Sequence, residues 1–323
     1  MKRISWLAAG GLACYGAARL AGADRYRRSE APVVPLLTFT PQVAAAALLG
    51  SLLLLRRGPA ATALVSGIAL AAVTAPRAIR RPQPQADGPV LRVITANLLH
   101  GRGSAEAVVS LVRRRSADVL FLQELTETAV SQLKQAGLTD LLPHEMTDFT
   151  RGRGLYARFP LTDGLRAGPA DAAPLTARLK LPGGQRADLV CVHASPPKPP
   201  WSRANVARWR EELAALPPPA ACPADPPRVL AGDFNASVDH ASLRRLLRLG
   251  HADAACQLGH GLIPTWGPEP AGRPGLLTID HVLVDPRCAV REVSVHPLPS
   301  SDHRAVYAEF QLPLAVERQV SRA

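Results

Sequence analysis

The chain has 323 residues, of which 47% are hydrophobic and 4% aromatic, and it carries a formal net charge of +12 at pH 7. Residues 1–88 contain eleven basic and three acidic residues, a net +8, which leaves only +4 for the rest. Because most of the basic excess lies in an otherwise apolar segment, the charge favours membrane anchoring over a nucleic-acid-binding surface. The five cysteines form no CxxC pair, so neither a zinc site nor a disulfide framework is indicated. A single Cys222–Cys256 or Cys256–Cys288 bridge stays open as an alternative.

The N-terminal third contains three apolar stretches at about residues 4–23, 33–55 and 60–77. Short basic loops separate them, and a helix of about 20 residues crosses a hydrocarbon core of about 30 Å. We therefore predict that residues 1–79 form a membrane anchor with three transmembrane helices. A soluble helical bundle is the alternative, but these stretches lack polar faces.

The expected location is the bacterial cell membrane, with a multi-pass anchor. Met1-Lys2-Arg3 precedes the first apolar stretch, as in exported segments, and favours an extracytoplasmic catalytic domain. The raw count of positive charges in the loops slightly favours the opposite orientation.

Residues 80–89 are rich in proline and glutamine and are predicted to be a linker, followed by a domain over 90–313 and a tail over 314–323. Apolar alternation and helical spacing predict two β-α units at the start of the domain: strand 90–97, helix 104–115 capped by Ser104, strand 118–124 and helix 126–135. Further predicted elements are strand 153–160, a hairpin of 175–181 and 186–192 around Pro-Gly-Gly, helix 201–216, strand 229–235, helix 239–249 capped by Asp239 or Ser242, and strands 276–284, 290–295 and 305–312.

Polar side chains stand where these strands begin or end. They are Asn97, Glu124, His193, Asp233, Asn235, Asp280, Asp302 and His303. Asp233-Phe234-Asn235 alone is more often plain turn chemistry, but so many amide, carboxylate and imidazole groups at strand ends form a pattern. Carboxylate and amide oxygens suit Mg²⁺ or Mn²⁺, which bind substrate phosphates. The histidines can transfer protons, and an aspartate paired to a histidine fixes its tautomer.

Six motifs carry a resemblance to a known family. In order they are Thr95-Ala96-Asn97, residues 118–124 (Asp-Val-Leu-Phe-Leu-Gln-Glu), Val192-His193, Gly232-Asp233-Phe234-Asn235, Ile279-Asp280-His281-Val282 and Ser301-Asp302-His303-Arg304. Together they resemble the endonuclease/exonuclease/phosphatase superfamily over about residues 90–312. The resemblance implies an α/β fold, a four-layer α/β sandwich in which two mixed, mostly antiparallel sheets pack together between helices.

The resemblance also implies roles for the motif residues. Glu124 corresponds to the principal metal ligand, with Asn97 in the metal and phosphate shell and Asp302 nearby. Asp233 corresponds to the residue that orients or deprotonates the attacking water, and Asn235 to a phosphate-binding residue. His303, held by Asp280, corresponds to the catalytic histidine, and His193 to a second one; which of them is acid and which is base stays open. Arg153 could contact phosphate, although an exposed structural arginine is an equal alternative.

The chain departs from the abasic-endonuclease branch, because Leu98, Leu99 and His100 follow Asn97 where that branch has an acidic residue. The domain also lacks the basic stripe and stacking aromatic residues expected of nucleic-acid binders. The apolar anchor and Pro264-Thr265-Trp266-Gly267-Pro268 resemble small membrane-anchored bacterial members, some associated with teicoplanin resistance. The predicted substrate is therefore a lipid-linked or cell-envelope phosphoester or pyrophosphate, and the predicted partner is the lipid bilayer.

Two alternatives to this function remain, a membrane-tethered nuclease and a non-catalytic envelope binding protein. The other histidines lie in no motif and are expected to be surface or structural residues; they are His100, His144, His240, His251, His260 and His296. His281 follows Asp280 on a strand and is expected to point to the opposite face.

Overall fold

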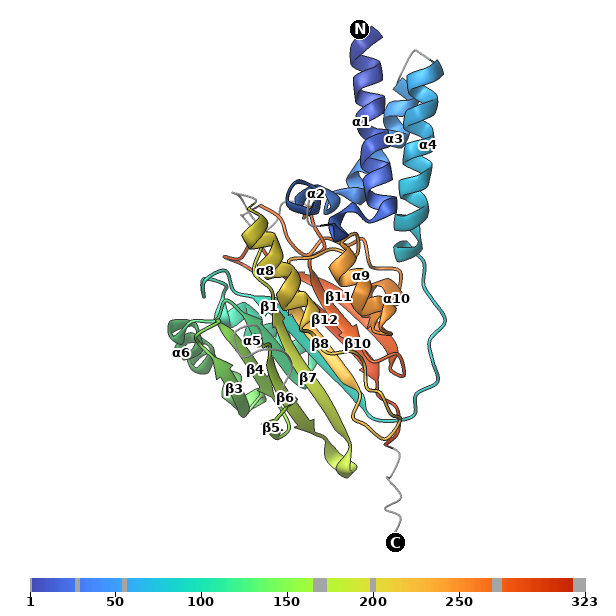
Figure 1. Cartoon of the computed structure of the whole chain (residues 1–323). Coiled ribbons are helices and arrows are strands. Elements are labelled where there is room, and N and C mark those ends of the chain that lie inside the picture. The colour runs from blue at the N-terminus through green and yellow to red at the C-terminus, as the bar shows by residue number, and fades with distance from the viewer. Residues whose placement is uncertain are drawn as a thin grey trace.

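The computed structural model describes residues 2–26, 30–53, 57–164, 173–197, 202–268 and 275–315 (Figure 1). A layered α/β domain occupies the lower part of the view, and a group of N-terminal helices stands above one end of it. The chain passes from the helices to the domain along one side.

Two six-stranded sheets form the centre of the described domain. The first contains β1 (Val90–Asn97), β2 (Val119–Gln123), β3 (His144–Asp148), β4 (Arg153–Ala157), β11 (Ala289–Pro297) and β12 (Arg304–Gln311), in the order β11-β12-β1-β2-β4-β3. The second contains β5 (Leu161–Asp163), β6 (Leu175–Lys180), β7 (Arg186–His193), β8 (Arg228–Asp233), β9 (Ala252–Asp253) and β10 (Asp280–Val284), in the order β5-β6-β7-β8-β10-β9. In each sheet one parallel pair, β1–β2 or β7–β8, lies between antiparallel strands.

Helices cover the outer face of each sheet and complete four layers. The first sheet carries α5 (Ala105–Arg115), α6 (Glu127–Gln135) and the short α7 (Leu138–Leu141), and the second carries α8 (Arg203–Ala214) and α9 (Ala241–Arg248). Between the sheets lies an apolar core that includes Val93, Phe121, Leu189, Val229 and Val306. Because strand side chains alternate, β1 sends Val93 into this core and Ile94 against the outer helices. The predicted sandwich of two mixed sheets flanked by helices is confirmed.

Local sequence explains how the β1–β2 parallel pair and its helices form. The Ser104 Oγ accepts the N–H of Ala107 and caps α5, and the Thr126 Oγ1 accepts the N–H of Ala129 and caps α6. All five residues of β2 are buried, so the strand reads as a continuous apolar run, as expected for a central strand with both faces covered. The carboxyl ends of β1 and β2 lie side by side, which brings Asn97 next to Gln123.

The sequence predictions differ from the structure in two details. The edge strands β3, β5 and β9 were not predicted, because their polar and partly exposed residues show no apolar alternation. Likewise, neither Asp239 nor Ser242 caps α9. Its N-cap is His240, which makes no side-chain hydrogen bond to the helix, and the Ala241 N–H binds the Asp24 carboxylate from the N-terminal segment. The short elements η3 (Pro182–Gly184) and α10 (Ala254–Gln257) complete the domain.

The N-terminal segment is helical but does not form three long spans. It contains α1 (Lys2–Ala21), η1 (Ala23–Arg25), α2 (Glu30–Leu37), α3 (Thr40–Leu53), α4 (Arg57–Thr74) and η2 (Ala75–Ala78). Among the described residues, only the helix Arg57–Ala78 is long and apolar enough to cross a membrane. The predicted span 33–55 is broken at a turn over Thr38 and Phe39, where the Thr40 Oγ1 donates to the Leu37 carbonyl. The prediction of three transmembrane helices is therefore not supported.

The predicted linker follows the edge of the domain. The Gln83 side chain accepts the Val290 N–H at 2.9 Å, and the Gly88 N–H donates to the Leu312 carbonyl at 2.9 Å. An isolated bridge pairs Arg80 with Leu258. Each of the five cysteines is free, so neither disulfide that the sequence left open is present.

Candidate active site

The corner at the end of β8 is built around a glycine that no other residue can replace. Gly232 has φ of +150°, and a Cβ there would lie 1.9 Å from the Val192 carbonyl oxygen. This close approach turns the chain so that the buried Asp233 carboxylate accepts the Asn235 N–H at 2.7 Å. The Asn235 side-chain amide donates to the Ala194 carbonyl at 2.9 Å and to Asp233 Oδ2 at 3.1 Å. Asn235 itself has φ of +47°, a strained conformation held by these bonds.

A second corner lies at the ends of β1 and β2 in the other sheet. Asn97 is fully buried, and its Nδ2 donates at 3.1 Å both to Glu124 Oε1 and to Asp233 Oδ2. One amide therefore joins the two carboxylates across the two sheets. Glu124 has φ of +53°, and its side chain remains 18% exposed, so that it can still meet a ligand. Asn97 acts here as a hydrogen-bond donor, and its role as a metal ligand stays a prediction.

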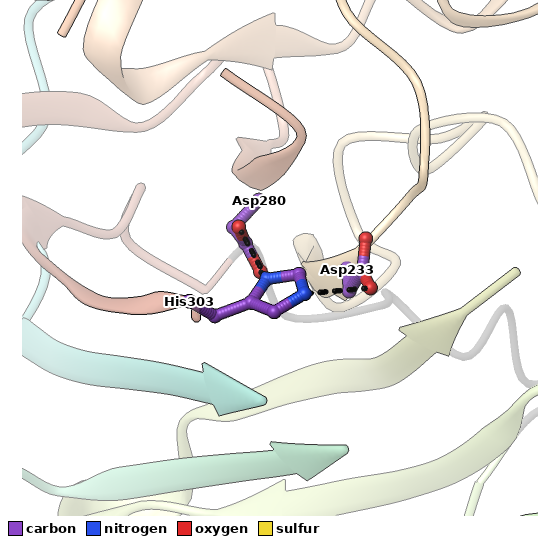
Figure 2. Close-up of side chains that lie close together, drawn as sticks. All are labelled: Asp233, Asp280 and His303. Carbon is purple, nitrogen blue, oxygen red and sulfur yellow. Dashed lines mark hydrogen bonds and ion pairs between the residues drawn. The ribbon is translucent and has the colours of Figure 1, made fainter. Parts of the chain in front are cut away.

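His303 lies between two carboxylates (Figure 2). Its Nδ1 is 3.0 Å from both oxygens of Asp280, and its Nε2 is 3.7 Å from Asp233 Oδ2. The geometry follows from strand direction: β10 is antiparallel to β8 and places Asp280 opposite Asp233, whereas His303 directly precedes β12. The pairing of His303 with Asp280 that the family resemblance implied matches this geometry.

Burial and charge shift the acid–base groups of this cluster. Burial alone would lower the pKa of His303, but the charges of Asp280 and Asp233 raise it to about 10. Burial raises the pKa of Asp233 to about 6, against the opposing effect of the His303 charge. At neutral pH this favours a protonated imidazole beside a mostly ionised carboxylate.

Glu124 is kept ionised by its hydrogen bonds. Burial would raise its pKa, but the hydrogen bonds from Asn97 and the His100 N–H, with the nearby His193 and His100 rings, lower the pKa below its usual range. The His193 Nε2 is 3.8 Å from Glu124 Oε1, so the second predicted histidine also reaches this corner.

Three contributors were missed from the sequence. The His100 N–H donates to Glu124 Oε2 at 2.8 Å, and its exposed ring places Nδ1 3.0 Å from the same oxygen. The Thr265 Oγ1 accepts the N–H groups of Ile279 and Asp280 and so orients Asp280. The Trp266 Nε1 donates to Asp302 Oδ2 at 2.9 Å. Spacing offered one signal, since His100 is three residues beyond Asn97.

Two predicted residues lie differently from expectation. Asp302 is held by Trp266, its Oδ1 is buried without a hydrogen-bond partner, and no contact joins it to Glu124 among the described residues. Arg153 is only 4% exposed, which contradicts the alternative of an exposed arginine. Its Nη1 donates to the Ala173 carbonyl, its Nε has no partner, and it lines a small recess with His193. Contact of Arg153 with phosphate stays a prediction.

Two groups of residues could hold a metal ion. Ligand atoms of Asp233, Asp280 and His303 lie within 4.8 Å of one another, but a protonated imidazole has no free lone pair for a metal. The second candidate is the Glu124 carboxylate with the adjacent Asn97 amide, and a place for Asp302 beside them stays a prediction. These hard oxygen donors fit Mg²⁺ or Mn²⁺ better than zinc.

The sequence of residues 94–303 matches the model of the Endonuclease/Exonuclease/phosphatase family. The chain belongs to this family. Its members hydrolyse phosphoester bonds and typically use divalent metals, so the predicted family and the class of reaction are confirmed. No curated protein matches the sequence.

Solved structures share the family fold. The endonuclease/exonuclease/phosphatase from Beutenbergia cavernae is 18% identical, with a TM-score of 0.51 over 70% of this chain and 72% of that chain. A humanized D. rerio TDP2 is 19% identical, with a TM-score of 0.52 over 69% of this chain and 99% of that chain. Sphingomyelinase C from Streptomyces griseocarneus is 17% identical, with a TM-score of 0.48 over 68% and 99%. At these identities the likeness is one of fold.

Proposed function

We propose that this family member is a divalent-metal-dependent phosphoester hydrolase whose active site is the two corners joined by Asn97. The observation that carries the proposal is the pair of bonds from Asn97 Nδ2 to Glu124 and Asp233, beside the His303–Asp280 pair. Five side chains suited to metal binding and proton transfer thus converge from both sheets. Convergence of this kind at strand ends is typical of catalytic sites.

In the proposed mechanism Glu124 and Asn97 would hold Mg²⁺ or Mn²⁺, with Asp302 as a further predicted ligand. Bound there, such an ion would supply positive charge near the phosphoryl oxygens. Asp233 accepts a proton from the attacking water, which its raised pKa of about 6 favours. Asn235 binds the scissile phosphate. His303, protonated at neutral pH and held by Asp280, donates from Nε2 to a phosphoryl or leaving-group oxygen, and His193 is the second histidine at the phosphate.

The proposed substrate is a lipid-linked or cell-envelope phosphoester or pyrophosphate. Its support is the apolar surface of the N-terminal helices, where large side chains are more than half exposed: Leu7, Leu52, Leu53, Val65 and Ile68. Exposed apolar surface on this scale favours contact with a lipid phase. We extend the proposal to an anchor in the bacterial membrane with the catalytic domain outside, as in the teicoplanin-resistance-associated members that the motifs resemble. Reporter fusions after Pro89 test this orientation, and a cytoplasmic signal would contradict it.

The decisive experiment uses the full chain in lipid nanodiscs with Mg²⁺. A polyprenyl diphosphate, a lipid monophosphate and plasmid DNA are offered separately, with Glu124→Ala as the control for the metal site. We expect phosphate release from the lipid diphosphate and its loss in Glu124→Ala. Cleavage of plasmid alone would select the nuclease, and release that is equal in the two proteins would overturn the assigned site. A D. rerio TDP2 structure contains a single-strand DNA product, which is why DNA is one arm of the test.

A further inference from the structure

A fully buried carboxylate joins the N-terminal helices to the catalytic domain. Asp239 follows the β8 corner, and its two oxygens receive Arg19 Nε at 2.7 Å and Arg77 Nη1 and Nη2 at 2.7 and 2.6 Å. Both arginine side chains are nearly as buried as the carboxylate. Arg19 comes from α1 and Arg77 from η2, so both cations belong to the N-terminal segment. A bidentate contact from one guanidinium and a third bond from another fix the carboxylate in one position.

Neighbouring contacts close the same junction. The His240 Nε2 is 2.8 Å from the Val34 carbonyl oxygen of α2, and the Asp24 carboxylate accepts the Ala241 N–H. Val34 is fully buried in the apolar cluster that contains Trp209 and Phe234 of the catalytic domain. The N-terminal segment therefore packs on the loop after β8 through buried ionic, polar and apolar contacts.

That loop begins with the proposed active-site residues. Only residues 236–238 separate Asn235 from Asp239. The Ser237 Oγ accepts the Asp239 N–H at 3.3 Å, and the Ser237 N–H donates to His240 Nδ1 at 2.9 Å. The intervening chain is short and hydrogen-bonded, so a displacement of Asp239 is expected to shift Asn235.

We propose that Arg19 and Arg77 are positioning residues which, through Asp239, hold the Asp233–Asn235 corner in its catalytic geometry. The N-terminal helices are then a part of the active site as well as an anchor. This inference rests on the proposed function, since it assigns Asp233 and Asn235 to the reaction. Figure 1 shows the N-terminal helices standing above one end of the catalytic domain, and the bonds from Arg19 and Arg77 to Asp239 join the two parts.

The chain offers a matched control for a merely structural ion pair. Arg178 binds the nearly buried Asp188 with two bonds, Nε to Oδ1 at 2.7 Å and Nη2 to Oδ2 at 3.2 Å. Asp188 lies near the start of β7, whereas the site residue His193 is at its end. Loss of this pair should weaken the fold without moving the β8 corner.

The experiment compares Arg77→Gln, Arg19→Gln and Arg178→Gln in the full chain in nanodiscs. Hydrogen exchange of the amides of residues 234–240 is the first measurement, and kcat, KM and the Mn²⁺ dissociation constant are the second. In Arg77→Gln we expect the amides of residues 234–240 to exchange about 10-fold faster. We expect kcat to fall by about 10- to 100-fold, because a misplaced group lowers the rate of the chemical step, while KM and the Mn²⁺ dissociation constant stay within about 3-fold of wild type. Arg178→Gln should change neither the exchange at 234–240 nor kcat.

The outcomes separate the two proposals. If Arg77→Gln lowers Tm but, like Arg178→Gln, leaves the exchange at 234–240 and kcat at their wild-type values, Arg19 and Arg77 are structural and the inference is overturned. If the wild-type chain hydrolyses no phosphoester, the proposed function fails, yet the exchange experiment still decides the positioning. If Arg77→Gln does not fold, Arg19→Gln, which removes one of the three bonds, replaces it and must show the same pattern at smaller size.

Discussion

Strand β10 carries two consecutive residues, Asp280 and His281, that belong to two buried histidine–carboxylate pairs on opposite faces of one sheet. Both ring nitrogens of His281 are hydrogen-bonded within the protein. Nδ1 is 2.7 Å from Asp253 Oδ2, and Nε2 is 2.8 Å from the Ala236 carbonyl oxygen. His303, which pairs with Asp280, uses only Nδ1 in this way, and its Nε2 faces Asp233 at 3.7 Å.

The difference teaches that a histidine–carboxylate pair alone does not indicate catalysis. An imidazole whose two nitrogens are both hydrogen-bonded inside the protein can stabilise the fold, but it has no nitrogen left for a substrate. The His303 Nε2 keeps that capacity. The comparison supports the proposed proton transfer by His303 and a structural role for His281, and the next predictions test this division.

The largest effect is expected at His303. His303→Ala should lower kcat by about 10²- to 10⁴-fold, because it removes the proposed proton donor. Its Tm should fall as well, because the buried Asp280 loses its charged partner, so kcat is measured at a temperature where both proteins are folded. Steady-state phosphate release at saturating Mg²⁺ measures kcat, and activity within 3-fold of wild type would remove His303 from the mechanism.

At His281 a loss of stability is expected without a loss of kcat. His281→Gln should lower the free energy of unfolding by about 3 kcal/mol, since it leaves the buried Asp253 without its charged partner. At temperatures well below Tm, kcat should stay within about 3-fold of wild type, because the His281–Asp253 pair lies on the face of the sheet opposite the proposed reacting groups. Urea unfolding and the same phosphate assay measure both quantities, and a large loss of kcat in a folded variant would break the comparison.

The pH dependence of stability sharpens the same contrast. Burial would raise the pKa of Asp253, but His281 holds it below the usual range; burial would lower the pKa of His281, but Asp253 raises it. The carboxylate contribution is complete above about pH 4 and is lost as pH falls through the lowered value, and the imidazole contribution is complete below about pH 6.5 and is lost as pH rises through the raised value. The Tm difference between wild type and His281→Gln should thus be largest near pH 5, and a difference that is constant from pH 3 to 9 would contradict it.

The smallest effect is expected at His100. His100→Gln should weaken Mn²⁺ binding by about 10-fold at most, because its ring and N–H orient the Glu124 carboxylate and the N–H remains. Isothermal titration with Mn²⁺ measures the change, with Glu124→Ala as the reference for full loss. Unchanged affinity would show that the exposed ring only rests against Glu124.

Much of the fold and part of the site were predictable because they depend on local pattern. Apolar strands that end in Asn97 or in Gly232-Asp233 predict both the sheets and the strand ends where the candidate site forms. The cap of α5 follows from Ser104 for the same reason.

Contacts between distant segments account for what the sequence could not supply. Thr265 and Trp266 act on residues 14 to 36 positions away, and no periodicity marks them. Asp239 looks like a helix cap until the folded chain brings Arg19 and Arg77 to it. Residues 33–55 look like one apolar helix, because composition does not register the turn at Thr38 and Phe39.

The Asn97 side chain has a consequence for how the enzyme is inactivated. Asn97 and Glu124 belong to one sheet and Asp233 to the other, and the His303–Asp280 pair also bridges from one sheet to the other. A slight parting of the two sheets would separate both sets of partners while each sheet kept its own hydrogen bonds. On heating, activity should then be lost when the two sheets separate. This loss should begin before circular dichroism records any loss of strands.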